Sequence, residues 1–365
     1  MGTVMVAATA APVAATPAAA ATTEPAPREL QSALDRIVDA GAIGAVAEIR
    51  DRHGVVRGHS GVAALDTHRA VPVQSRFRIG SITKTFVATV TLQLVDEGRL
   101  NLNDTVEKWL PGVVPGGDKI TLRYLLNHTS GLYDYLHTLT FPPDPAFLAY
   151  RSRTWTAEEL IHRAVSNPPV VKDPGKQFSY SNTNYILLGE IIEKATGRTY
   201  GEEIERRIIR PLRLRGTTVP GTSEQIPGPH PHGYVPVRQG EDTQLVDYTE
   251  MNPSVMGAGG EIISTTSDLN RFYAALFGGR LVPSSLLDEM TEAGTDGGRY
   301  GLGLFIVRTT CGITVYGHDR DALAYDAWAY STKDGRRQVA IAVTPDHAGN
   351  PDEAVDALVD AAFCG

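Results

Sequence analysis

Residues 76–98 read RFRIGSITKTFVATVTLQLVDEG and hold the most informative pattern of the chain. Apolar residues recur there at helical spacing, which predicts a helix that ends at Gly98. The apolar character is typical of a helix buried in a protein core. Ser81 and Lys84 stand three positions apart, so both side chains would lie on one face of the first turn.

A serine and a lysine at this spacing indicate nucleophilic catalysis. A serine hydroxyl is a poor nucleophile at neutral pH and needs a neighbouring base. Lys84 can serve as that base if burial or positive potential lowers its pKa. The start of a helix also offers backbone N–H groups to a developing oxyanion. Because Ser-x-x-Lys also occurs at ordinary solvated helix starts, the buried setting is what gives the motif its weight.

Length and composition limit the possible classes of protein. The chain has 365 residues, of which 42% are hydrophobic and 21% charged, and a net charge of -8. This length suits one large domain or two closely packed ones. The acidic balance, with no basic stripe, argues against a nucleic-acid partner. No apolar run is long enough to span a membrane, so we expect no membrane-spanning segment.

Residues 1–28 are rich in Ala, Thr and Pro and carry no Lys or Arg before Arg28. They are either the remnant of an export signal followed by a linker or a disordered tail. We exclude them from the fold and place the catalytic domain at residues 29–365. An export remnant would make the protein secreted or extracytoplasmic, whereas a simple tail would leave it cytoplasmic.

The chain has two cysteines, Cys311 and Cys364. They are either two buried free thiols or one disulfide that ties the C-terminal helix to the strand region before His318. A disulfide would imply an oxidising compartment. His230 and His232 form a His-x-His pair in a Pro- and Gly-rich loop, with no further ligand in sight. We therefore expect no metal site and no cofactor.

Strand patterns gather near both ends of the chain, and helical patterns fill the middle. The predicted strands are Ala45–Arg50, Val55–His59, Tyr300–Val307, Ile313–Tyr316, Ala324–Tyr330 and Gln338–Val343. This order predicts an α+β fold: one antiparallel sheet built from both termini, flanked by helices, with an inserted and mainly helical region. We expect the α/β part at about 29–90 and 290–365 and the helical part at about 91–289. Residues 133–156 look like a long irregular loop.

Two further motifs carry side chains suited to acid–base chemistry. Tyr180-Ser181-Asn182 is either a turn with a helix cap or a catalytic element. In the catalytic interpretation, Tyr180 is a base or proton shuttle and Asn182 a hydrogen-bond donor, provided that a lysine lies near the phenol. His318 follows the strand predicted to end at Tyr316, and a histidine at a strand end is usually structural.

The ordered triple Ser-x-x-Lys, Tyr-x-Asn and His resembles the penicillin-recognising serine acyl-transferases, in particular the D-alanyl-D-alanine carboxypeptidase and class C β-lactamase group. The similarity runs from about Glu29 to Gly365 and includes Phe77–Ser81, Leu94–Gly98, Ser130–Tyr135, Tyr180–Asn184, Tyr300–Leu304 and Tyr316–His318. It implies an enzyme in which Ser81 attacks an acyl carbonyl and forms an ester. Lys84 and Tyr180 would share the proton transfers.

The resemblance implies roles for other residues as well. Asn182 would hold the amide of the substrate, and His318 would support Tyr180 or the leaving group. The backbone N–H groups of Ser81 and Asp321 would form the oxyanion hole. The two cysteines fall where a secreted carboxypeptidase of this group has its disulfide, which favours a disulfide here.

The third motif departs from the pattern of the family. The family has His-Thr-Gly or Lys-Thr-Gly, where this chain has His318-Asp319-Arg320. Asp319 and Asp321 place acidic groups where a threonine would help bind a substrate carboxylate, and Arg320 replaces the glycine that lets substrate lie close to the strand. The closest carboxypeptidases have an arginine for that carboxylate where this chain has Phe305. We therefore expect weak recognition of a free C-terminal carboxylate, with Asp319, Arg320 and Phe305 shaping the substrate site.

Three functional hypotheses follow. The first is a serine hydrolase or acyl transferase that acts on an ester, amide or D-amino-acid peptide. Its acyl group would pass to water or to an amine, the latter as in an amide-forming transacylase of natural-product assembly. The second is a D-alanyl-D-alanine carboxypeptidase of cell-wall metabolism. The third is a non-catalytic binding protein whose cleft is blocked by Arg320. We expect a monomer with a small-molecule or peptide acyl donor.

Overall fold

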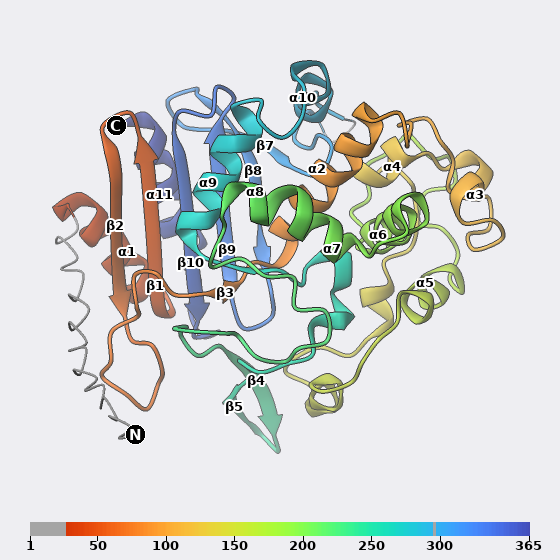
Figure 1. Ribbon diagram of the computed structural model, residues 1–365. Coiled ribbons are helices and arrows are strands. Elements are labelled where there is room, and N and C mark those ends of the chain that lie inside the picture. The colour runs from red at the N-terminus through yellow and green to blue at the C-terminus, as the bar shows by residue number, and fades with distance from the viewer. Residues whose placement is uncertain (1–26, 295–296) are drawn as a thin grey trace, which may run out of the picture.

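The computed structural model describes residues 27–294 and 297–365. Strands from both ends of the chain form a six-stranded antiparallel sheet in the order β2-β1-β10-β9-β8-β7 (Figure 1). These strands are β1 (Ala42–Asp51), β2 (Gly54–Gly61), β7 (Phe305–Arg308), β8 (Thr314–Asp321), β9 (Asp326–Thr332) and β10 (Gln338–Pro345). The predicted α+β architecture, with a sheet built from both termini, is confirmed.

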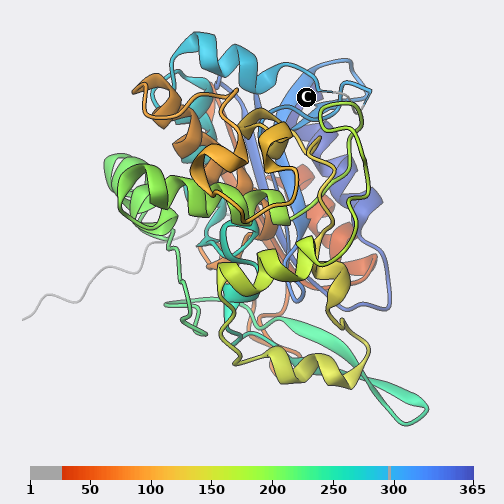
Figure 2. The same ribbon diagram turned by 90° about the vertical axis from the view of Figure 1, so that its right-hand side faces the viewer.

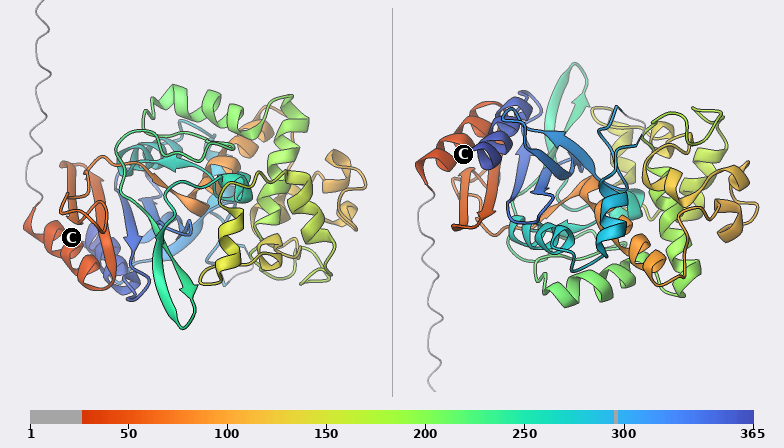
Figure 3. Two further views of the ribbon diagram at one scale, coloured as in Figure 1. Left: turned by 90° about the horizontal axis from the view of Figure 1, so that it is seen from below. Right: turned by 90° about the horizontal axis from the view of Figure 1, so that it is seen from above.

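Helices cover both faces of the sheet. Helices α1 (Arg28–Asp39) and α11 (Asp352–Cys364) lie side by side on one face, and α9 (Thr266–Phe277) packs on the other (Figure 3). Strand β10 shows the consequence, because alternate side chains of a strand point to opposite faces. Val339 and Ile341 join the apolar cluster that contains α1 and α11, whereas Ala340 and Ala342 join the cluster on the opposite face. Every residue of β10 is buried.

The middle of the chain forms a second, mainly helical region beside β7 and β8, and Figure 2 shows its helices in front of the sheet. Its helices are α2 (Thr83–Asp96), α3 (Val106–Trp109), α4 (Leu122–Leu126), α5 (Ala157–Val165), α6 (Thr183–Thr196), α7 (Tyr200–Ile204), α8 (Arg210–Leu212) and α10 (Ser284–Thr291). Two small sheets pair β3 (Phe77–Arg78) with β6 (Ile263–Ser264) and β4 (Tyr234–Gln239) with β5 (Asp242–Asp247).

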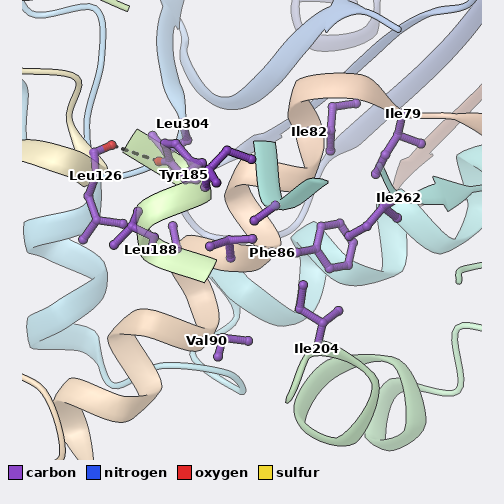
Figure 4. Packing of buried hydrophobic residues seen from close by; sticks show 14 of the residues in the cluster. Ile79, Ile82, Phe86, Val90, Leu126, Tyr185, Leu188, Ile204, Ile262 and Leu304 are labelled. Atoms are coloured by element: carbon purple, nitrogen blue, oxygen red, sulfur yellow. Dashed lines mark hydrogen bonds between the residues drawn. The ribbon is translucent and has the colours of Figure 1, made fainter. Parts of the chain in front are cut away.

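Helix α2 is the centre of this arrangement. It is buried from Thr83 to Leu92, as its apolar sequence predicts. Phe86 stacks on Phe272 of α9, with 3.8 Å between the ring centroids. Tyr185 of α6 belongs to the same core, and its hydroxyl donates to the carbonyl of Leu126 at 2.9 Å (Figure 4). The first turn of the helix lies in this core, so Lys84 is completely buried.

Strand β8 differs from the sequence prediction in a way that affects the site. It does not end at Tyr316 but continues to Asp321, so His318 lies inside the strand rather than after it. Strand β7 pairs with β8 only as far as Gly317. Pairing with β9 continues through Asp321, and this second partner supports the longer strand.

Other predicted boundaries were also wrong. The strand predicted over 300–307 begins only at Phe305, because the backbone at Gly303 is left-handed (φ 80°). Residues 133–156 are not one irregular loop, since they contain short 3-10 helices at Tyr135–Thr138 and Pro145–Tyr150. Helices α1, α9 and α10 and the β4–β5 hairpin are additional elements that the sequence patterns did not identify.

The described residues contain one disulfide and no membrane-spanning helix. Cys311 and Cys364 form a disulfide that joins the end of α11 to the turn between β7 and β8. Within the described residues, no helix combines the length and the apolar character needed to cross a membrane. The hypothesis of an export remnant or tail at 1–28 concerns residues that lie almost entirely outside the described part.

Candidate active site

Ser81 lies in a short 3-10 turn, Gly80–Ile82, that leads directly into α2. The backbone of Gly80 is left-handed (φ 49°), a conformation that glycine adopts without strain. The turn packs against β8 and leaves Ser81 only 5% exposed. Ser81 thus precedes the α-helix instead of starting it, but the spacing to Lys84 still brings the two side chains together.

Lys84 is the centre of a buried hydrogen-bond network. Its Nζ lies 2.9 Å from Ser81 Oγ, 2.7 Å from Asn182 Oδ1 and 2.7 Å from the carbonyl oxygen of Gly259. Burial lowers the pKa of Lys84 to about 7, although the negative charge of Asp134 acts in the opposite direction. Lys84 can therefore exchange a proton near neutral pH, as a general base for Ser81 requires.

Tyr180 approaches the same serine from the other side. Its hydroxyl donates to Ser81 Oγ at 2.9 Å. Its ring stacks on the imidazole of His128, with 4.1 Å between the ring centroids and 29° between the ring planes. The backbone N–H of Ser181 donates to Nδ1 of His128 at 3.2 Å, which anchors the segment that carries Tyr180.

His128 is completely buried beneath Tyr180. Burial lowers the pKa of His128 well below its ordinary value, and the charges of Lys84 and His318 act in the same direction. The imidazole is therefore neutral at physiological pH. A neutral ring supports the phenol of Tyr180 without adding a second positive charge beside Lys84.

Asn182 connects the nucleophile to a buried carboxylate. Its backbone N–H and its Nδ2 both donate to Asp134 Oδ2, at 3.0 Å and 2.8 Å. These two bonds orient the amide so that Oδ1 faces Lys84. The role of Asn182 in holding a substrate amide stays a prediction, but the structure does bring it to the nucleophile.

His318 lies inside β8 and is completely buried. Its Nε2 is 3.1 Å from the hydroxyl of Tyr300, and its Nδ1 is 2.7 Å from the backbone oxygen of Asp319. The ring of Phe305 meets the imidazole edge to face, with centroids 4.9 Å apart. Tyr300 also contacts the ring of Tyr180 edge to face, at 6.4 Å between centroids, and so links His318 to Tyr180.

The acidic positions of the third motif lie at the end of β8. The carboxylate of Asp319 accepts a hydrogen bond from Tyr330 at 2.5 Å, and Tyr330 belongs to the apolar cluster of α1 and α11. Because side chains alternate along a strand, this carboxylate and the His318 ring are on opposite faces of β8. The carboxylate of Asp321 accepts the backbone N–H of Leu323.

Strand β8 carries both Arg320 and Asp321, and Asp321 supplies one of the two N–H groups predicted to form the oxyanion hole. The backbone of Arg320 pairs with Ala327 of β9, but its side chain lies outside the described residues, as do the expectations that rest on it. The N–H groups of Ser81 and Asp321 belong to the 3-10 turn and to β8, which pack against each other. Their joint role as oxyanion hole stays a prediction.

Three of the five predicted catalytic residues line a pocket of about 1210 Å³. Ser81, Tyr180 and Asn182 contribute to its wall, and so do Asp319 and Asp321 of β8. Most of the remaining lining is apolar: Leu136, Phe141, Phe178, Met256, Phe305, Ile306, Val307 and Leu323. A wall of this kind suits a ligand with an apolar side chain and a few polar groups close to the nucleophile.

The sequence prediction missed four groups that complete the site: His128, Asp134, Tyr300 and the carbonyl of Gly259. Asp134 and Tyr300 stand in stretches that carry the family resemblance, but no spacing rule connects them to Ser81.

His232, one of the two histidines of the His-x-His pair, has its Nδ1 2.6 Å from a carboxylate oxygen of Asp247. In the described part of the chain, no three His, Cys, Asp or Glu side chains come together as a metal site would require.

Comparisons with known proteins identify the family of the chain. A family model described as Beta-lactamase matches residues 30–363, and the chain belongs to this family. It is similar to a D-stereospecific amidohydrolase from Streptomyces sp., with 43% identity, a TM-score of 0.83, and coverage of 92% of this chain and 98% of that one. It is also similar to the D-amino acid amidase from Ochrobactrum anthropi SV3 in complex with L-phenylalanine amide. There the identity is 27% and the TM-score 0.79, over 91% of this chain and 97% of the other.

Curated relatives match over a shorter range. A penicillin-binding protein of Bacillus subtilis (strain 168) is 33% identical over 225 residues, which are 60% of this chain and 48% of that protein. The chain thus spans about half the length of the curated relatives it matches. The structural matches cover 91–92% of this chain, and together with these similarities they place the protein in a family of serine hydrolases and acyltransferases that includes β-lactamases and penicillin-binding proteins.

Proposed function

We propose that the protein is an amidohydrolase that hydrolyses amides and short peptides of D-amino acids through an acyl-enzyme on Ser81. The observation that carries this proposal is that Ser81 Oγ receives hydrogen bonds from both Lys84 and Tyr180, each at 2.9 Å, at the wall of an apolar pocket. The stereochemical preference rests on the similarity to the D-stereospecific amidohydrolase and the D-amino acid amidase over nearly the whole chain.

The proposed reaction has two balanced steps. In the first, neutral Lys84 takes the proton of Ser81, and Oγ attacks the amide carbonyl while the N–H groups of Ser81 and Asp321 stabilise the oxyanion. Tyr180 gives its proton to the departing nitrogen, which leaves as ammonia or an amine, and the proton on Lys84 then restores the phenol. In the second step water loses a proton to Lys84 as it attacks the ester. Ser81 Oγ leaves with a proton from Tyr180, the proton on Lys84 again restores the phenol, and the acid is released.

The part of the pocket wall around Phe305, where the leaving group would lie, favours an uncharged amide as substrate. Phe305 packs against His318 at the position where the resemblance to carboxypeptidases would imply an arginine for a substrate carboxylate. An aromatic ring offers no hydrogen bond to a carboxylate, so a substrate with a free C-terminal carboxylate would be bound weakly. The same site would accept an amine in place of water, so acyl transfer is an outcome that the experiment must distinguish.

The Cys311–Cys364 disulfide supports a location of the protein in an oxidising, extracytoplasmic compartment.

The test is turnover of D-phenylalanine amide, with L-phenylalanine amide, a D-alanyl-D-alanine peptide and a fluorescent penicillin as comparison substrates. We expect Ser81-dependent release of ammonia from the D-amide, little from the L-amide, and slow labelling by the penicillin. Ser81→Ala is the control, and intact mass after a rapid quench should show the acyl adduct. Preferential cleavage of the D-alanyl-D-alanine peptide would favour the carboxypeptidase hypothesis instead. Diversion of product to an amide by an added amine would favour a transacylase.

A further inference from the structure

A second hollow, of about 720 Å³, is lined by residues from the start of α9 and from α8. These two helices meet on one face of the sheet (Figure 1). Five arginines from four separate segments line it: Arg57, Arg76, Arg213, Arg215 and Arg271. It shares no lining residue with the catalytic pocket. The chain as a whole has a net charge of -8, so this concentration of positive charge opposes the overall balance.

Two of the arginines are held at the first turn of α9. Arg57 of β2 pairs with the buried Glu48 at 2.7 Å, and its Nη2 lies 3.5 Å from Ser267 Oγ. Arg271, one turn further along α9, lies 3.5 Å from Asp268. Both guanidinium groups therefore stand at the helix start with their positions set by the fold.

A third arginine supports the segment that carries the last two. Arg76 donates to the carbonyl oxygen of Arg215 at 2.9 Å, and Arg271 donates to that of Arg213 at 3.0 Å. The side chains of Arg213 and Arg215 are exposed, and no hydrogen bond or ion pair to them is found among the described residues. Two positive charges in the hollow are thus not neutralised by the described part of the protein.

The negative charge in the hollow is already engaged by the protein. Asp268 is the one carboxylate among the described lining residues. It accepts the backbone N–H of Gly216 at 2.7 Å and the hydroxyl of Thr217 at 3.0 Å. Helix α9 has twelve residues, and Ser267, which lines the hollow, stands in its first turn, where its backbone N–H has no intrahelical acceptor. This N–H adds one donor to the guanidinium groups.

We propose that this hollow binds an anion that carries two or more phosphate groups. Guanidinium groups match phosphate oxygens with paired hydrogen bonds, and the start of a helix favours the same charge. Arg213 and Arg215 offer two guanidinium groups without a described partner, and Arg57, Arg76 and Arg271 line the same hollow of about 720 Å³ with one contact or more each already made within the protein. Positive charge spread over this volume suits a chain of phosphates better than a single phosphate. The inference does not depend on the proposed reaction, because the two sites share no residue.

The test is isothermal titration of the full chain with tripolyphosphate, orthophosphate and citrate at low and moderate salt. We expect tripolyphosphate to bind best, with an affinity that falls as salt rises. The double variant Arg213→Gln/Arg215→Gln should weaken binding about tenfold, since it removes two charge-assisted contacts without disturbing a described partner. The matched control is Arg238→Gln/Arg280→Gln, which removes two exposed arginines outside the hollow and should bind as the wild type does.

Three outcomes would overturn the proposal: no binding of tripolyphosphate, equal weakening in both double variants, or equal affinity for citrate and tripolyphosphate. Equal affinity for orthophosphate would overturn the requirement for several phosphates. Ser81→Ala should bind tripolyphosphate unchanged, which separates this site from the catalytic pocket. Thermal unfolding of each variant without ligand checks that the fold is intact.

Discussion

Lys84 and Glu261 are two buried ionisable residues of the same molecule, and both have a pKa of about 7. Burial is the main cause in each case, lowering the pKa of the lysine and raising that of the carboxyl group. Their surroundings differ. Lys84 contacts the hydroxyl of Ser81, whereas Glu261 is contacted by the phenol of Tyr200. Burial sets the pH range in which each group titrates. The neighbouring residue sets what we expect the titration to change: the rate of the reaction at Lys84, and the free energy of unfolding at Glu261.

The largest expected effect comes from removing the base. Lys84→Met should lower kcat/KM for the D-amide by about 10³-fold, because the serine then has no group that takes its proton near pH 7. Wild-type kcat/KM should rise with pH through about 7, as Lys84 loses its proton. Steady-state kinetics over a pH series checks both statements. Lys119→Met, at an exposed lysine, is the control, and substantial residual activity in Lys84→Met would assign the base to Tyr180 instead.

Removing the other buried charge should change stability rather than catalysis. The pKa of Glu261 is raised from 4.5 to about 7, so the folded state holds an extra proton between these values and loses stability as pH rises through that window. Between about pH 4 and pH 8, the free energy of unfolding of the wild type should fall by about 3 kcal/mol relative to Glu261→Gln. Urea unfolding at several pH values measures this difference. Exposed Glu158→Gln is the control, and parallel profiles for wild type and Glu261→Gln would contradict the assignment.

Asp134 is a charged neighbour of the buried lysine. It orients Asn182 and raises the pKa of Lys84, so a change at Asp134 separates these two effects. Asp134→Asn keeps the shape but removes the charge. We expect kcat to fall about 10- to 100-fold through loss of orientation, and the rise of kcat/KM to move to lower pH as the pKa of Lys84 falls. A lower kcat with an unmoved pH profile would show that Asp134 acts on geometry alone.

The smallest effect concerns the leaving-group side. Phe305→Arg should raise the ratio of kcat/KM for a D-alanyl-D-alanine peptide to that for the D-amide by about tenfold, through a charged hydrogen bond to the carboxylate. Phe305→Leu is the matched control and should leave the ratio as it is. An unchanged ratio in Phe305→Arg would place the determinant of carboxylate recognition outside β7.

Local patterns were enough to predict part of the fold. The apolar helix after Ser81 and the strands at both chain ends follow from periodicity, which depends only on neighbouring residues. The end of β8 could not be found in this way. His318 to Asp321 are polar, and they form a strand because β9 pairs with them over their full length. Tertiary pairing outweighs local propensity in such a segment.

The sequence by itself determined the position of the proposed nucleophile Ser81, its spacing to Lys84 and the order of the three motifs, because these are properties of the chain. Only the tertiary structure decided that His128 lies under Tyr180 and that Asp134 orients Asn182. It also decided that five arginines from four segments meet beside α9. Each of these arrangements joins residues that are far apart in the chain, and packing of the core, not spacing along the sequence, brings them within contact distance.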